Sequence, residues 1–492
     1  MPYLGVTPST AASADLDGKE LILDADADTT ITADTDDQID IRIAGADDFQ
    51  FTANTLTALS GSTIATNTIA ETTGGSGVTI DGLLIKDTTA AFADGAVTTP
   101  SITNTGDLNT GVYFPAADTV GITAGGTEQF RFGSNPIPGG QKNMLINGAF
   151  TISQRGASFA ISPNASGSDS DYTLDRWFLF AYLTDSDYTV TQETLTPGTD
   201  EPYDHGFRNS IKVDCTTSAT PAGSDTLALS QKLEGFNVQR LAYGDAQAKE
   251  STVSFWHKHT KTGTQCVTIQ TSGGGKWTSK QYTQSVSNTW EYATVTIPGD
   301  TATAPANDSA ARLDIMFGVS VGSTYTSGSE AAWGTTNGDY FPGQVNNMDS
   351  TSNNFEIAGV QWEVGSVATD FAHEDYGTTL WKCYRYFWRF QANTASGQKW
   401  MLTGLTRSTT SSRYACPMQT EMRATPTLTS SSGTTSDIYD GVVQIATDAI
   451  ALQAGTPGGV QIQVDFGGSG TAGNATGWLA DNGATFDFSA EL

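Results

Sequence analysis

The sequence predicts an all-β protein, and three observations carry the prediction. Apolar and polar residues alternate in many short stretches, which is typical of half-buried strands. Glycine contributes 52 of the 492 residues and, with abundant Ser, Thr and Asn, supplies turns between short strands. A segment near residue 40 also recurs near residue 120. We therefore predict a β-rich stalk over 21–138, a β-sandwich over 139–376 and a smaller C-terminal β-sandwich over 377–492.

The formal net charge of -29 restricts the partners. Nucleic acids and anionic membranes are negative themselves and repel such a chain, so neither is expected as a partner. The N-terminus lacks the basic start and apolar core of a signal peptide, and no apolar run is long enough to cross a bilayer. We expect synthesis in a cytoplasm and a role as part of a particle.

Residues 1–20 form a predicted leader. Pro2 and Pro8 oppose a helix, and 9–14 is small and weakly structured. A segment that does not fold alone gains structure by docking onto another protein, so we predict particle attachment here. A disordered terminus is an equally compatible interpretation.

The stalk begins with acidic strands. Ile39, Ile41 and Ile43 alternate with polar residues, which predicts strands whose outer face is charged. The spacing of Asp24, Asp26 and Asp28 invites a calcium interpretation, but the central Gly and distal Glu of an EF-hand loop are missing. A solvated strand face is the better interpretation, and no metal or other cofactor is predicted.

An internal repeat lies within the stalk. Residues 37–54 align with 118–135, where Phe49 and Phe51 match Phe130 and Phe132. Each copy predicts a β-hairpin with its aromatic residues on one face. A single hairpin is marginal in water, so its apolar row needs a partner surface. Equivalent rows from neighbouring chains supply one in an oligomeric stalk; stacking within one chain is the alternative.

The turn-rich segment 133–140 predicts a domain boundary, and the sandwich follows. We expect an opening strand within 145–152 and a closing strand within 355–365. The other expected strands are Trp177–Tyr182, Ser210–Cys215, Leu227–Lys232, Ser251–Lys258, Thr264–Thr271, Trp290–Ile297 and Arg312–Ser320.

The last domain is expected to start with a long aromatic strand over 381–391, and alternation within 443–445, 460–464 and 485–488 predicts further strands. The four cysteines form no C-x-x-C pair, which gives no support to a zinc or redox site. They are interpreted as buried apolar residues, with a Cys383–Cys416 bridge as the alternative.

No catalytic set stands out, and no enzymatic activity is expected. His257 and His259 lie two apart on a predicted strand, as metal ligands can, but no third ligand is evident, so exposed strand histidines are the preferred interpretation. Aromatic residues in or near loops are more informative, because sugar rings stack on aromatic rings. The candidate glycan-binding residues are Trp277, Tyr282, Trp333 and Tyr340; core packing is the alternative for each.

Several motifs carry a family resemblance: 143–156, 172–177, 231–241, 357–365, 383–387 and 486–492. In this order they resemble bacteriophage tail-fibre and receptor-binding proteins with a carbohydrate-binding-module-like sandwich. The resemblance, with 105–113 in the stalk, implies a homotrimer with a jelly-roll-like sandwich, held to other virion proteins by its N-terminus and binding a host surface glycan. Such modules often hold a structural calcium beside an N-G-x-F-E strand. Here Thr151 replaces the Glu, so no calcium is predicted.

The function expected from these observations is that of a phage tail fibre with outward-pointing C-terminal domains. A head fibre or capsid-decoration protein is one alternative. A polysaccharide depolymerase tailspike is another, although the sequence lacks the coil-by-coil repeat of a parallel β-helix.

Overall fold

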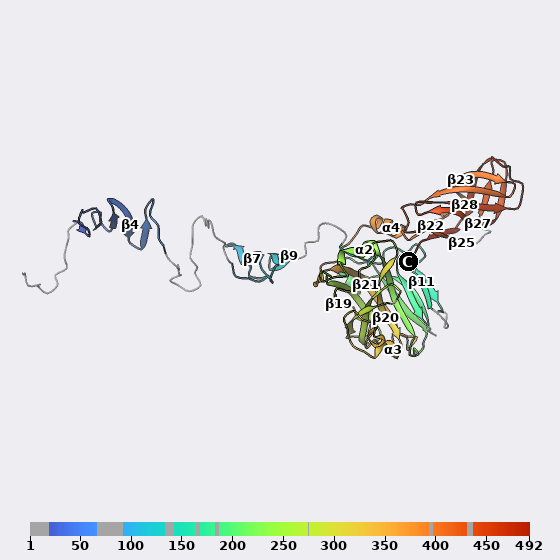
Figure 1. Cartoon of the computed structure of the whole chain (residues 1–492), viewed down its shortest axis with the longest axis horizontal. Helices are drawn as coiled ribbons and strands as arrows, with labels where there is room; N and C mark the ends of the chain where they lie inside the picture. The colour runs from blue at the N-terminus through green and yellow to red at the C-terminus, as the bar shows by residue number, and fades with distance from the viewer. Residues whose placement is uncertain are drawn as a thin grey trace, which may run out of the picture. The chain divides into compact units, whose positions relative to one another are not determined.

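The computed structural model describes residues 19–65, 92–132, 142–163, 168–182, 186–273, 275–392, 397–430 and 436–492. The chain divides into two units, one of Met1–Ala116 with Gly121–Gln129 and one of Ala117–Val120 with Phe130–Leu492. Strands dominate both units, which confirms the all-β class (Figure 1). The predicted leader up to residue 18 and the boundary at 133–140 lie outside the described residues. Within the described ranges no helix is long and apolar enough to span a membrane.

The stalk region contains two antiparallel sheets. The first has strands β1 (Leu21–Ile22), β2 (Thr30–Thr32), β3 (Ile39–Ile43), β4 (Ala46–Thr52) and β5 (Thr55–Ala58) in chain order. The second has β6 (Ile102–Asn104), β7 (Asp107–Tyr113), β8 (Val120–Ala124) and β9 (Thr127–Phe132). The repeat is confirmed as two hairpins, β3–β4 and β8–β9. Both turn through two residues of positive φ, Ala44–Gly45 and Gly125–Gly126, as a tight hairpin turn requires.

Apolar side chains of these sheets remain exposed within the single chain. Phe130 and Phe132 are 64% and 59% exposed, although both follow the alternation of a strand face. Other large apolar side chains share this exposure: Ile39, Ile43, Phe51, Leu56 and Leu108. In this single chain the repeat therefore leaves much of its apolar surface in contact with water.

The sandwich consists of two six-stranded antiparallel sheets. One runs β10 (Ser158–Ile161), β13 (Asp187–Thr194), β14 (Asn209–Thr217), β21 (Asn354–Val364), β16 (Ser251–His259), β19 (Glu291–Ile297). The other runs β11 (Ser168–Tyr172), β12 (Phe178–Tyr182), β15 (Thr226–Glu234), β20 (Ala311–Val321), β17 (Gly263–Thr271), β18 (Trp277–Gln284). The predicted strands after residue 176 are all present, whereas β10, β11, β13 and β18 were not expected. The core between the sheets includes Trp177, Phe255, Phe317, Ile357 and Trp362.

The expected opening strand is wrong: Asn143–Ser153 is a buried loop. Asn147 and Phe150 adopt left-handed backbone conformations, with φ of 59° and 55°. The Asn147 amide accepts from the Ile152 N–H and donates to the carbonyls of Ile152 and Asp175 at 2.9 and 3.0 Å. One side chain thus supplies hydrogen bonds that a neighbouring strand would otherwise provide.

The expected aromatic strand at 381–391 is also corrected. Helix α4 (Tyr376–Tyr384) occupies its first part, and strand β22 (Phe387–Gln391) only its second. Asp375 caps the helix by accepting from the Thr378 N–H at 2.9 Å. Thr379 and Cys383, four residues apart, form the buried stripe of the helix.

The C-terminal domain is a closed barrel with a small sheet instead of a second sandwich. The barrel runs β23 (Gln398–Ser408), β24 (Ser411–Pro417), β28 (Gly459–Phe466), β27 (Gln444–Thr456), β26 (Ser436–Tyr439), β29 (Ala475–Asp481). The sheet joins β22, β30 (Thr485–Ser489) and β25 (Thr427–Ser430). All four cysteines are buried and free, so the Cys383–Cys416 bridge is not formed.

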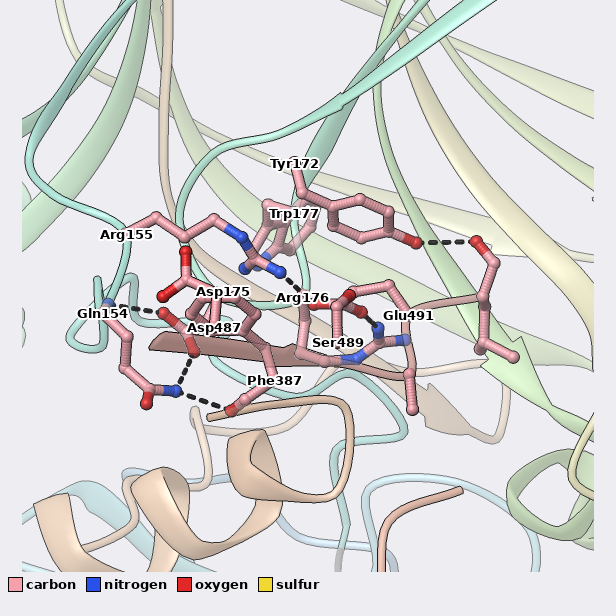
Figure 2. A network of polar contacts seen from close by, with 12 residues as sticks. Gln154, Arg155, Tyr172, Asp175, Arg176, Trp177, Phe387, Asp487, Ser489 and Glu491 are labelled. Carbon is pink, nitrogen blue, oxygen red and sulfur yellow. Dashed lines mark hydrogen bonds and ion pairs between the residues drawn. The ribbon is translucent and has the colours of Figure 1, made fainter. Parts of the chain in front are cut away.

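A buried contact joins the sandwich to the C-terminal domain (Figure 2). Arg176 is 1% exposed, forms an ion pair with Glu491, donates to the Lys232 carbonyl at 2.7 Å and stacks on the Tyr386 ring at 3.5 Å. Arg155 reaches the other Glu491 oxygen at 3.1 Å. One carboxylate is therefore shared by two arginines, which offsets the cost of burying three charges.

Polar side chains extend this contact on one side. The Gln154 main chain donates to Asp175 at 2.7 Å, and its side-chain amide donates to the Phe387 carbonyl at 2.9 Å (Figure 2). Arg389 donates to the Arg155 carbonyl at 2.9 Å and pairs with Asp487 through two bonds of 2.7 Å. We call Gln154, Arg155, Asp175, Arg176, Tyr386, Phe387 and Glu491 the interdomain contact. These are residues of the motifs that carry the family resemblance.

Replacing Arg176 tests this contact. Arg176→Met removes one charge and leaves Glu491 buried beside Arg155 alone, so we expect a loss of about 3–5 kcal/mol in the free energy of unfolding. Denaturant unfolding of residues 142–492, followed by tryptophan fluorescence, measures it.

The matched control is Arg312→Met, which breaks an exposed pair with Asp308. It is expected to leave the unfolding midpoint unchanged. Equal effects of the two substitutions would contradict the role of the interdomain contact.

Candidate functional site

A cleft of about 580 Å³ lies on the second sandwich sheet, on the face turned away from the core. Along β12, Leu179 and Ala181 point into the core, whereas Phe178, Phe180 and Tyr182 line the cleft. Strands β15, β17 and β20 alternate in the same way. The remaining lining side chains are Ser170, Thr226, Ser230, Lys232, Gln270, Ser272, Trp277, Asp314, Met316, Tyr325, Asn337 and Tyr340.

Aromatic rings form one wall of the cleft. Trp277 and Tyr340 lie 4.8 Å apart between ring centroids, and Tyr325 contacts Tyr340 edge-on at 5.6 Å. Trp277, at the start of β18, is fixed by two 2.9 Å main-chain hydrogen bonds to Gly334. Its indole nitrogen is buried without a hydrogen-bond partner among the described residues. The wall therefore offers aromatic faces on a rigid backbone.

Polar side chains form the floor. The Tyr340 hydroxyl donates to Gln270 at 2.6 Å, and the Gln270 amide donates to Asp314 at 3.1 Å. Ser272 also donates to Asp314, at 2.5 Å. Burial raises the pKa of the Asp314 carboxyl, and these hydrogen bonds and Lys232 partly oppose that rise. The floor is thus a preorganised array of amide, hydroxyl and carboxyl groups.

Such a cleft suits a sugar chain chemically. Aromatic faces take up the apolar faces of pyranose rings, while amides and carboxyls take up their hydroxyl groups. Glycoside hydrolysis ordinarily uses two carboxylic acids across the bond that is cut. Among the described lining residues, Asp314 alone carries a carboxyl group.

The structure brings only part of the predicted site together. Trp277 and Tyr340 line the cleft. Tyr282 is a correction: it is buried, packs edge-on against Phe255 at 4.9 Å and belongs to the core. Trp333 is half-buried against the core, and its indole donates to the Pro298 carbonyl at 2.8 Å.

Sequence analysis missed the aromatic residues on strand β12. Phe178, Phe180 and Tyr182 alternate with the core residues Leu179 and Ala181, so both faces of this strand are apolar. In a sheet that has one face toward solvent, a strand is expected to be polar on that face. Apolar residues on both faces of this strand therefore indicated a binding surface.

His257 and His259 are buried, which corrects the expectation of exposed histidines. His257 Nδ1 lies 2.8 Å from the Gln284 amide oxygen, and His259 Nε2 lies 3.1 Å from the Tyr282 hydroxyl. The Glu356 N–H donates to His259 Nδ1 at 3.3 Å, which leaves Nε2 as the protonated nitrogen of the neutral ring. Burial lowers the pKa of both histidines, most strongly for His259.

The carboxylates of Asp24, Asp26 and Asp28 lie within 4.8 Å of one another. They stand in the bend after β1 and not on a strand face, which corrects that expectation. Two of them are exposed and the third is half-buried, an arrangement that acidic side chains adopt without an ion.

Comparisons with known proteins give matches among solved structures alone: no family model and no curated protein matches the chain. The enzymatically active domain of tailspike protein 4 from bacteriophage CBA120 is 17% identical over 45% of this chain, with a TM-score of 0.24. The chain spans 21% of that tailspike chain. A family 11 carbohydrate-binding module of Clostridium thermocellum, in complex with a β-1,3-1,4-mixed-linked tetrasaccharide, is 11% identical over 43% of this chain and 98% of its own, with a TM-score of 0.21. A family 4 module is 16% identical over 44% and 98%, also at 0.21.

The buried histidines generate a prediction about pH. Below about pH 6.5 the unfolded chain binds a proton at His259 that the folded chain does not, so stability falls as the pH falls, by up to about 1.4 kcal/mol per pH unit. We expect His259→Gln to show a shallower loss of unfolding free energy than the natural chain between pH 7 and pH 5.

Comparing the two chains isolates this effect from the buried carboxyls of Asp175, Asp314 and Glu356, whose raised pKa values act with the opposite sign. The pKa of Glu291, near His257, is lowered. This carboxyl therefore changes the pH dependence of stability only below the usual titration range of a glutamate. Denaturant midpoints at each pH measure the slopes; identical slopes would show that His259 does not bind its proton differently in the two states.

Proposed function

We propose that this chain is a structural fibre protein of a bacteriophage tail that binds a neutral glycan of the host surface in the sandwich cleft. The observation that carries the proposal is the pairing of an aromatic wall with an amide and carboxyl floor in a cavity of about 580 Å³. The resemblance of its motifs to phage receptor-binding proteins supports the setting. A net charge of -29 disfavours an anionic glycan, because like charges repel.

The cleft binds its glycan without cutting it under this proposal. The described lining residues include one carboxyl, whose raised pKa comes mainly from burial. Incubation with host surface polysaccharide tests this point: release of short oligosaccharides would support a depolymerase instead.

The stalk assembles three chains around a common axis under the same proposal. Its repeated hairpins expose matching apolar residues, which cost free energy in water and are buried when equivalent rows meet. The leader then attaches to another virion protein, and the sandwich and barrel point toward the host. A fibre on the phage head would need the same trimer, attachment and orientation. Immunolabelling of virions distinguishes a head location from a tail location.

The trimer predicts a specific response to substitution. Light scattering of the purified full chain is expected to give three times the mass of one chain. Phe130→Asp places a charge in the exposed apolar row and is expected to lower this mass toward that of the monomer. Gln129→Asp, on the opposite face of β9, is the control and should leave the trimer intact. A natural chain that stays monomeric at micromolar concentration would exclude this assembly.

The cleft predicts an effect on host binding. Residues 142–492 should compete with phage adsorption, and Trp277→Ala should weaken the binding by about 1–2 kcal/mol through loss of a stacked ring, or roughly 5- to 30-fold. Trp381→Ala removes an exposed tryptophan of helix α4 outside the cleft and serves as the control.

Competition assays with host cells measure both variants. Equal affinities of the two variants would exclude the cleft as the receptor site. Blocking by residues 1–141 but not by 142–492 would reverse the proposed orientation of the fibre.

A further inference from the structure

The outer wall of the C-terminal barrel carries an exposed tryptophan on an unusual support. Trp400 on β23 is 54% exposed, and its six-membered ring lies against Gly477 of the neighbouring strand β29. A Cβ atom at Gly477 would stand 1.6 Å from Cζ3 of Trp400 and 2.2 Å from Cε3. The ring can therefore rest on this strand only because residue 477 has no side chain. One ring face is held against the backbone, while the residue remains half exposed.

A second aromatic ring borders this surface. Tyr439 on β26 pairs with Gly477 from the other side of β29, and its ring meets that of Trp400 at 6.0 Å and 73°. We call Trp400, Tyr439 and Gly477 the barrel platform. Three adjacent strands of a closed barrel thus position two aromatic rings around one glycine.

Polar side chains lie at one end of the platform. Gln398, two residues before Trp400, donates to Asp481 at 3.0 Å and contacts Asp437. Gln444 donates to the same Asp437 at 2.6 Å. These amides and carboxylates sit half-buried or exposed at the surface, where they can exchange hydrogen bonds with a ligand's hydroxyl groups.

We infer that the barrel platform is a second carbohydrate site, which stacks one neutral hexopyranose ring on Trp400. A fixed, flat indole matches the apolar face of a pyranose, and the neighbouring amides and carboxylates match its hydroxyls. The carboxylates of Asp437 and Asp481 disfavour an anionic sugar. The platform shares no residue with the sandwich cleft, so this inference stands or falls separately from the cleft.

Substitution of Gly477 distinguishes a stacking site from an unspecific apolar patch. Gly477→Ala keeps both aromatic rings but pushes the indole off the strand, so it should abolish sugar stacking. An apolar patch would keep its binding in this variant. A second copy of the chain as the occupant would instead make the oligomeric mass depend on Trp400.

Affinity electrophoresis of the full chain tests the inference, using native gels that contain mannan, galactan, dextran or mixed-linkage β-glucan, with polygalacturonate as the anionic comparison. The starting protein is the Trp277→Ala variant, in which the cleft is weakened. We expect at least one neutral polysaccharide to retard it, and polygalacturonate not to. Adding Trp400→Ala or Gly477→Ala should remove that retardation, whereas adding Trp381→Ala, a tryptophan of matching 55% exposure, should not.

The inference is overturned if no neutral polysaccharide retards the Trp277→Ala protein, if Gly477→Ala binds as well as its parent, or if Trp400→Ala changes the mass measured by light scattering. Retardation that depends on Trp400 but not on Trp277 would uphold the platform and reject the cleft.

Discussion

The buried pairing of Arg176 with Glu491 is the interaction that connects the sandwich with the C-terminal domain in the second unit. Both groups are buried, so removal of either partner leaves a charge without compensation in a medium of low polarity. The pair joins Glu491 to the sandwich. From the C-terminal domain, Arg423 donates to the carbonyls of Ala490 and Glu491 at 2.6 and 2.7 Å. The residues that follow β30 are thereby held by arginines of both domains.

This arrangement explains why most of the motif residues do not line the cleft, although Lys232 of the 231–241 motif does. Gln154, Arg155 and Arg176 meet Tyr386 and Phe387 and are occupied by stacking and hydrogen bonds within the protein. A combination of Arg, Asp and aromatic residues indicates recognition of some kind, and here the recognised surface is another domain of the same chain. Polar motifs in a β-protein therefore do not by themselves locate a receptor site.

The sequence predicted the elements that follow from local alternation of apolar and polar residues. It did not predict those that depend on side-chain hydrogen bonds to the backbone or on closure of the barrel. Alternation predicted the central strands and both hairpins. It could not reveal that Asn147 replaces a strand partner, or that Asp375 caps a helix in an aromatic stretch. Barrel closure depends on the register between distant strands such as β23 and β29, which no short segment contains.

The candidate site was predictable to a similar degree. Trp277 and Tyr340 were found because they stand beside turns, where strand alternation does not account for an aromatic residue. Tyr282 was misplaced because it lies near Trp277 in sequence, but on a strand whose successive side chains point to opposite faces. Trp400 was overlooked because its meaning depends on Gly477, a residue distant in sequence and adjacent only in the barrel.

The interdomain contact also has a consequence for avidity. Buried ion pairs connect the C-terminal segment to the sandwich, so the cleft and the platform belong to one compact unit of a single chain. Occupation of one surface then presents the other to the same polymer at a high effective concentration, provided that the spacing of the sugar units matches. If both surfaces bind sugars as proposed, weak contacts with single sugars select a long, regularly repeating polysaccharide over its free fragments.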